Sequence, residues 1–148
     1  MIGTVQYALP IEDVVQVLLP SEIIATPTTL REAVGLARFR DDLVPVVDLR
    51  LRFGTTARLS RSTRWLAARS SMHCALFVID AITQVFGGTD EGLRPAPPSA
   101  SQALGCEVLG VTEFSKASIL VIDVQPLVMA ASGLARPTLP PNSSSPRR

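Results

Sequence analysis

Residues that carry covalent or metal chemistry are scarce in this chain of 148 residues. Its two cysteines, Cys74 and Cys106, share no C-x-x-C spacing, so neither a metal site nor a disulfide framework is indicated. The single histidine, His73, leaves a zinc site short of ligands, and its neighbour Cys74 points to the opposite face of a predicted strand, so a nucleophilic pair is not expected. Because the spacings HExxH, GxSxG, GxGxxG and the P-loop are also absent, we expect no enzyme and no cofactor.

Charge of one sign and long apolar runs are lacking as well. Fourteen basic residues against thirteen acidic ones leave a formal charge of +1, without the positive field of a nucleic-acid-binding protein. No apolar run reaches about 18 residues, and the N-terminus lacks the basic-then-apolar order of a secretion signal. We therefore expect a cytoplasmic protein that neither binds nucleic acid nor inserts into a membrane.

The hydrophobic residues, 47% of the chain, follow a pattern typical of β-strands. They form short runs rich in Val, Ile and Leu, separated by clusters of Pro, Gly and Ser, which predicts a barrel or sandwich. The expected strands are Val5 to Leu9, Val15 to Leu19, Val34 to Phe39, Leu43 to Asp48, Arg64 to Arg69, Cys74 to Ile79, Val108 to Thr112 and Ile119 to Asp123.

Helical and irregular segments are expected to be few. Pro10 and the acidic residues after it favour a helical turn over Ile11 to Val17, and apolar spacing favours another over Asp80 to Val85. A last helix is expected over Val124 to Ala135, starting near Pro126. The stretch Gly87 to Ser101 reads as irregular, and the Pro- and Ser-rich residues 136–148 read as a disordered tail.

The most specific motif is the run LVPVVDLRLRF from Leu43 to Phe53. Pro45 has no N–H, so the strand that carries it must lie at an edge or contain a bulge. Asp48 and Arg50 point the same way on an extended chain, which lets the carboxylate cap a turn and pair with the guanidinium. We favour a structural role for both residues over a functional one.

This motif resembles the signature strand and turn of CheW-like domains. Four further pieces fall in the order of that family: YALPIEDVVQV from Tyr7, IDAITQV from Ile79, LRPAPP from Leu93, and LGV followed by ILVIDVQPL from Leu109 to Leu127. The resemblance implies a mainly all-β fold of two packed SH3-like five-stranded β-barrel lobes with short helices. The domain would span residues 1–135, with the lobe boundary near residues 60–70.

The resemblance also implies a scaffold without an active site. Such an adaptor has two protein partners, the regulatory domain of a CheA-type histidine kinase and the cytoplasmic tip of a methyl-accepting chemoreceptor, whose helical end docks into a groove. The signalling array could serve flagellar swimming or twitching on pili. The alternative is a degenerate CheW-like regulatory or ligand-binding β-barrel without receptor coupling.

Carried over by position, the partner-binding residues implied by the family are Val14, Gln16, Gly35, Arg40, Asp41, Val44, Trp65 and Leu76. Arg40 matches the family's arginine after the third strand of the first lobe. Asp41 replaces a customary glycine, so it must take left-handed geometry or reshape the turn, and with Asp42 it could pair with Arg40. Gln16 replaces a glutamate and Leu76 a glycine, while Tyr7 and Trp65 are read as core or inter-lobe aromatics.

One departure from the family concerns its first strand. That strand ought to precede the turn at Gly3 to Gln6, where this sequence has only Met1 and Ile2. A missing strand exposes a neighbouring edge and uncovers part of the core. The true start lies upstream, which we favour, or a partner supplies the strand, or the barrel is degenerate.

Overall fold

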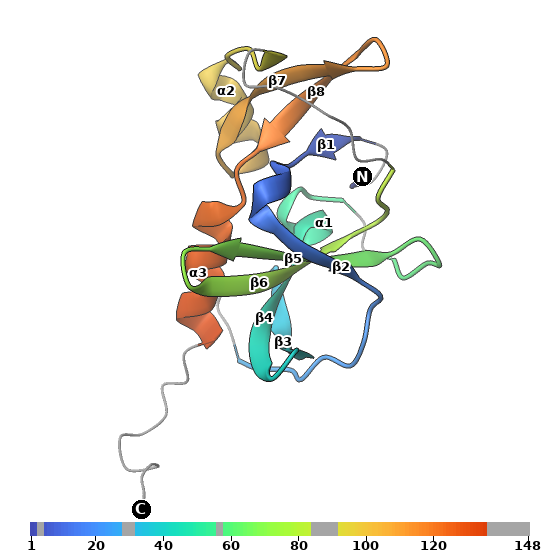
Figure 1. Cartoon of the computed structure of the whole chain (residues 1–148), viewed down its shortest axis with the longest axis vertical. Coiled ribbons are helices and arrows are strands. Elements are labelled where there is room, and N and C mark those ends of the chain that lie inside the picture. The colour runs from blue at the N-terminus through green and yellow to red at the C-terminus, as the bar shows by residue number, and fades with distance from the viewer. Residues whose placement is uncertain (3–4, 28–31, 56–57, 84–91, 136–148) are drawn as a thin grey trace, which may run out of the picture.

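The computed structural model describes residues 1–2, 5–27, 32–55, 58–83 and 92–135, which form two β-sheets and three α-helices (Figure 1). The larger sheet contains, in spatial order, β2 (Val14–Leu18), β5 (Arg64–Ser70), β6 (His73–Ile79), β4 (Asp42–Asp48) and β3 (Ala33–Phe39). The smaller sheet has the order β1 (Tyr7–Ala8), β8 (Ala117–Ile122) and β7 (Val108–Phe114). All eight strands expected from the sequence are therefore confirmed.

The expected pair of five-stranded barrels is met only in part. The larger sheet has five strands, but the smaller one has three, and within the described residues neither sheet closes on itself. Two pairings are parallel, β1 with β8 and β4 with β6, and the others are antiparallel. The expected lobe boundary near residues 60–70 falls just before and within β5, and the division into lobes stays a prediction. The expected tail, residues 136–148, lies outside the described residues.

Pro45 shows why strand β4 tolerates a proline. β4 lies inside the larger sheet, but its pairing with β6 starts only at Val46, so the first half of the strand has a partner on one side only, β3. Pro45 faces Leu36 of β3 in this half. The expectation of an edge or a bulge in this strand is therefore not met as stated: β4 lies inside the sheet and the register shift is in β3, but the half of β4 that holds Pro45 is paired on one side only.

A glycine bulge recurs in the two sheets. Gly35 in β3 and Gly110 in β7 each follow a register shift and have positive φ, +147° and +159°. A Cβ on Gly35 would collide with the backbone oxygen of Ile24, and one on Gly110 would collide with that of Arg94. Ile24 forms a β-bridge to β3, and Arg94 forms one to β7. Each glycine therefore makes room for a further segment of the chain to join its sheet. The repeat is structural and has no counterpart in the residue pattern.

The helices differ from expectation in three places. The turn expected over Ile11 to Val17 is a 3-10 helix only at Ile11–Asp13, because the β-branched residues that follow pair with β5 instead. The helix expected from Asp80 is absent at residues 80–83, where Asp80 and Ala81 donate backbone hydrogen bonds to Met1, and the rest of that segment lies outside the described residues. The end of the expected irregular stretch forms α2 (Pro98–Leu104), with proline at its start and left-handed Gly105 at its end.

The last helix and the core join the two sheets. The helix expected at the C-terminal end is confirmed as α3 (Gln125–Ala135), which packs against β4, β5 and β6. Its buried side chains share one core cluster with Leu49, Phe77 and Ile122. A second cluster, which includes Trp65 and Leu76, draws its buried members from β3 to β6 of the larger sheet. Within the described residues, no helix is long and apolar enough to cross a membrane.

Candidate functional site

The Asp48–Arg50 pair of the signature motif is buried and structural. Asp48 caps α1 (Leu49–Arg52) by accepting a 3.0 Å hydrogen bond from the Arg50 backbone N–H. The Arg50 guanidinium donates two 2.9 Å hydrogen bonds to the same carboxylate and further ones to the Arg58 carbonyl and to Asp80. These hydrogen bonds with Asp48 raise the pKa of Arg50 above its usual value. The predicted structural role of Asp48 and Arg50 is confirmed.

Arg40 stands at the tip of the β3–β4 hairpin. Phe39 pairs with Asp42, so Arg40 and Asp41 form a two-residue turn, and both are exposed. Arg40 itself has the positive φ, +57°, whereas Asp41 does not. Of the two outcomes expected for Asp41, left-handed geometry is not found, and the turn is instead shaped by the positive φ of the residue before it. The guanidinium carbon of Arg40 lies 5.0 Å from the centre of the Phe39 ring, a cation–π distance.

The acidic neighbours leave Arg40 available for an external carboxylate. In the part of the chain that the structure describes, neither Asp41 nor Asp42 forms an ion pair with Arg40. Arg40 makes no hydrogen bond with Gln16 either. In sheet order, Gln16 on β2 and Arg40 after β3 belong to opposite edge strands. An exposed guanidinium held over an aromatic ring is partly ordered before a partner arrives, which reduces the entropy lost on binding.

The other residues carried over from the family lie on the same sheet, mostly inside it. Trp65 and Leu76 are 3% and 0% exposed, and Val44 is 7% exposed. Gly35 is buried against Ile23 and Ile24. Any part that these four residues take in partner binding would therefore act through the shape of the sheet, and Leu76 fills space inside the core. The partly buried Val14 lines a cavity.

Two exposed apolar side chains near the hairpin tips could not be identified from the sequence pattern. Leu43, at the start of β4, is 49% exposed, and Met72, in the β5–β6 turn, is 95% exposed. Near the start of β6, the Cys74 thiol has its pKa raised by burial, partly offset by the positive charges of Arg40 and Arg69. Single apolar residues in turns carry no period, so only the fold, in which β4 and β6 are parallel neighbours, shows that the two turns lie at the same end of the sheet.

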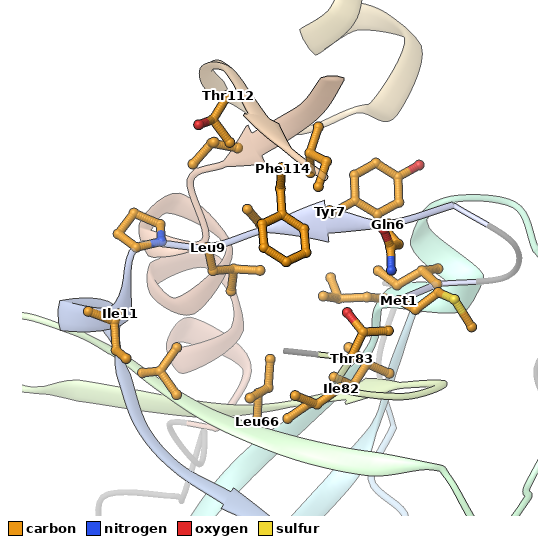
Figure 2. Close-up of a pocket in the computed structure, with 18 of the residues that line it drawn as sticks. Met1, Gln6, Tyr7, Leu9, Ile11, Leu66, Ile82, Thr83, Thr112 and Phe114 are labelled. Atoms are coloured by element: carbon orange, nitrogen blue, oxygen red, sulfur yellow. The ribbon is translucent and has the colours of Figure 1, made fainter. Parts of the chain in front are cut away.

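A cavity of about 510 Å³ is lined by residues of both sheets (Figure 2). Tyr7 and Leu9 line it from β1 and the residues after it, Leu66 from β5, and Phe114 from β7. Its remaining lining residues include Met1, Gln6, Ile11, Val17, Ile82, Thr83, Leu93, Leu109 and Ile119. Beside it, the rings of Tyr7 and Phe53 pack 5.1 Å apart, which confirms Tyr7 as an aromatic between the sheets.

Comparisons with known proteins agree on one family. A model of the CheW-like domain matches residues 1–132. The chemotaxis protein CheW of Helicobacter pylori is 29% identical over 102 residues, which are 68% of this chain and 62% of that protein, so the match spans less than two thirds of the relative. The crystal structure of the scaffolding protein TtCheW from Thermoanaerobacter tengcongensis superposes with a TM-score of 0.74 at 26% identity, over 83% of this chain and 84% of that one.

Proposed function

This chain belongs to the CheW-like domain family of chemotaxis scaffold and adaptor proteins, which are not enzymes, and we propose that it couples chemoreceptors to a CheA-type histidine kinase. The partners would be the regulatory domain of the kinase and the cytoplasmic tip of a methyl-accepting receptor, which places the scaffold in the cytoplasm. By holding both, it would raise their effective concentration and pass on the receptor state as a shift in the kinase population.

The observation that carries this proposal is the exposed Arg40 at the tip of the β3–β4 hairpin. The exposed Leu43 and Met72 supply apolar area at the same end of the sheet, because β4 and β6, which follow the two turns, are parallel neighbours. An arginine surrounded by apolar contacts is a frequent centre of protein–protein interfaces, because water is excluded around a planar, bidentate donor. We assign this hairpin face, defined as Arg40, Leu43 and Met72, to the kinase regulatory domain.

The receptor tip needs a different surface, and the outer rim of the cavity supplies one. Ile11, Val17 and Leu109 line the cavity and are 64%, 46% and 44% exposed. Aliphatic side chains along a cleft suit the apolar stripe of a helix. We call these three residues the rim and assign it to the helical receptor tip.

A three-component pull-down with a kinase regulatory domain and a receptor cytoplasmic fragment tests both assignments. Wild type should retain both partners, Arg40→Glu should lose the kinase domain, and Ile11→Glu should lose the receptor fragment. Met129→Glu is the matched control, since Met129 is 46% exposed on α3 and belongs to neither surface. Loss of both partners in the Met129 variant would contradict the assignments.

The cavity favours one second candidate, a regulatory barrel that binds a small apolar molecule. Its volume of about 510 Å³ falls in the range of small-molecule sites, and its lining is largely aliphatic. If a folded wild-type chain retains neither partner, while an apolar ligand raises its melting temperature, this second function replaces the coupling function.

A further inference from the structure

Positive charge is concentrated in one part of the chain. Between Asp48 and Asp80 the sequence contains six arginines and no acidic residue, although the whole chain has a formal charge of only +1. Surfaces of small soluble domains mix charges of both signs, so this stretch is unusual for a surface that binds nothing. The six residues are Arg50, Arg52, Arg58, Arg61, Arg64 and Arg69.

Internal carboxylates account for two of these six charges. Arg50 pairs with Asp48 and Asp80, and Arg52 pairs with Glu32 at 2.6 Å. In the described part of the chain, the other four arginines form no ion pair. Their charges are therefore not neutralised by the fold itself.

Three of these four arginines lie together in the turn that leads into β5. We call Arg58, Leu59, Arg61 and Arg64 the basic turn. Arg58 and Arg61 are exposed, Arg64 is partly buried, and Leu59 is 79% exposed. In Figure 1 this part of the chain projects as a loop beyond the start of β5. The basic turn thus presents an apolar side chain together with cationic ones at a projecting site.

Hydrogen bonds hold the backbone of the basic turn in one shape. The Ser60 N–H donates to the Thr63 hydroxyl at 2.9 Å, and the Thr63 N–H donates to the Ser60 carbonyl at 3.2 Å. Nη1 of Arg64 donates to the carbonyls of Arg61 and Thr63 at 2.7 and 2.9 Å. The Arg58 carbonyl accepts a 2.7 Å hydrogen bond from the buried guanidinium of the signature motif. Because the turn is ordered before a partner arrives, less entropy is lost on binding.

We propose that the basic turn binds an acidic segment of another protein, in which carboxylates flank an apolar side chain. Guanidiniums bind carboxylates through paired N–H donors, and arginines around an apolar centre are typical of protein interfaces. Leu59 would contact the apolar side chain, and Arg58 and Arg61 would contact the carboxylates. The basic turn has too few cations for a phosphate backbone, and one leucine is too little apolar area for a membrane.

The basic turn and the hairpin face lie at opposite ends of the larger sheet. In the pairing of β5 with β6, Arg64 lies opposite Ile79 at one end, and Ser70 lies opposite His73 at the other. Met72 belongs to the turn at this second end. The inference therefore goes beyond the coupling function, and the acidic segment would bind in addition to the kinase and the receptor.

Binding of labelled peptides to the full chain, measured by fluorescence anisotropy, tests the proposed partner chemistry. One short peptide carries glutamates on both sides of a leucine, and a matched peptide carries glutamines in place of the glutamates. The glutamate peptide should bind at least about tenfold more tightly, and its affinity should fall as the ionic strength rises. Equal affinities for the two peptides, or an affinity that does not depend on salt, would overturn the proposal.

Two double variants with the same change in net charge locate the binding surface. Arg58→Glu with Arg61→Glu should weaken binding of the glutamate peptide at least about tenfold. Tm should not change, because the hydrogen bonds of the described turn use neither guanidinium. Arg38→Glu with Lys116→Glu changes two exposed cations elsewhere and should bind like wild type. Leu59→Ser should weaken binding about threefold or more. Equal weakening by the two double variants would reveal an effect of net charge alone and overturn the proposal.

Phosphatidylserine vesicles and a single-stranded oligonucleotide test the other classes of anionic partner. If either binds wild type more tightly than the glutamate peptide does, and the Arg58 and Arg61 double variant loses this binding, the proposal is overturned in favour of that class. The same double variant should retain both the kinase domain and the receptor fragment in the pull-down, so failure here is distinct from failure of the coupling function. Loss of either partner would assign the basic turn to the coupling surfaces and overturn its separate role.

Discussion

At the scale of single residues, Asp48 and Arg50 form an ion pair that is 5% and 6% exposed and is part of a buried network. Asp48→Ala removes both the cap of α1 and the partner of a buried guanidinium, and breaking a buried pair from one side costs about 3–5 kcal/mol. We expect that loss in the free energy of unfolding, measured by urea denaturation. The control is Glu113→Ala, which removes the exposed Arg94–Glu113 pair, 3.9 Å apart, and should change stability by less than about 1 kcal/mol. Equal losses for the two variants would contradict the assignment.

The two free thiols provide a second test at this scale. Burial raises the pKa of both Cys74 and Cys106. A raised pKa means that the folded state favours the neutral thiol, so less thiolate is present near pH 8 than in the unfolded chain. Both cysteines should react with a disulfide reagent more slowly in the folded protein, and stability should fall as the pH rises through the ordinary thiol pKa. Reaction as fast as in denaturant would contradict the burial of these thiols.

At the scale of elements, the two bulge glycines have a structural role that the sequence pattern does not reveal. Gly35→Ala and Gly110→Ala each add a Cβ against backbone in a conformation that only glycine adopts easily. Each should lower the free energy of unfolding by about 1–3 kcal/mol. Gly54→Ala is the control: Gly54 has φ +74° but open space around it, so only the cost of left-handed geometry remains. A larger loss at Gly54 than at Gly35 would contradict the close approach.

The strands were more predictable from the sequence than the helices or the site. Runs of β-branched residues between turn residues predicted all eight strands, because local composition and sheet pairing favour the same state in these segments. The segment 80–83 failed because its backbone pairs with Met1, a contact distant in the sequence. Of the residues proposed from the family, Arg40 is exposed at a hairpin tip, whereas Val44, Trp65 and Leu76 are buried, and the exposure of Met72 depends on a turn. Burial of a strand face is set by the partner sheet and α3, which periodicity alone does not identify.

At the scale of the whole molecule, one core cluster takes residues from both sheets and from α3. Ile122 of β8, Phe77 of β6 and Val128 of α3 belong to the same cluster. The buried Asp13, just before β2, also accepts a 2.9 Å hydrogen bond from Gln125 at the start of α3. We therefore expect both sheets to unfold together, so that Trp65 fluorescence and far-ultraviolet circular dichroism give coincident urea transitions. Two separated transitions would mean that the sheets form independent folding units.

The central claim is that the hairpin face around Arg40 binds the kinase regulatory domain. Its most direct test is a calorimetric titration of that domain with wild type, Arg40→Glu and Lys116→Glu. Lys116 is the matched control, because it is an exposed cation in the two-residue turn of the β7–β8 hairpin, with positive φ like Arg40. The account predicts that Arg40→Glu weakens Kd at least about tenfold with an unchanged Tm, while Lys116→Glu binds like wild type. Equal weakening by both variants, or undiminished binding by Arg40→Glu, would contradict it.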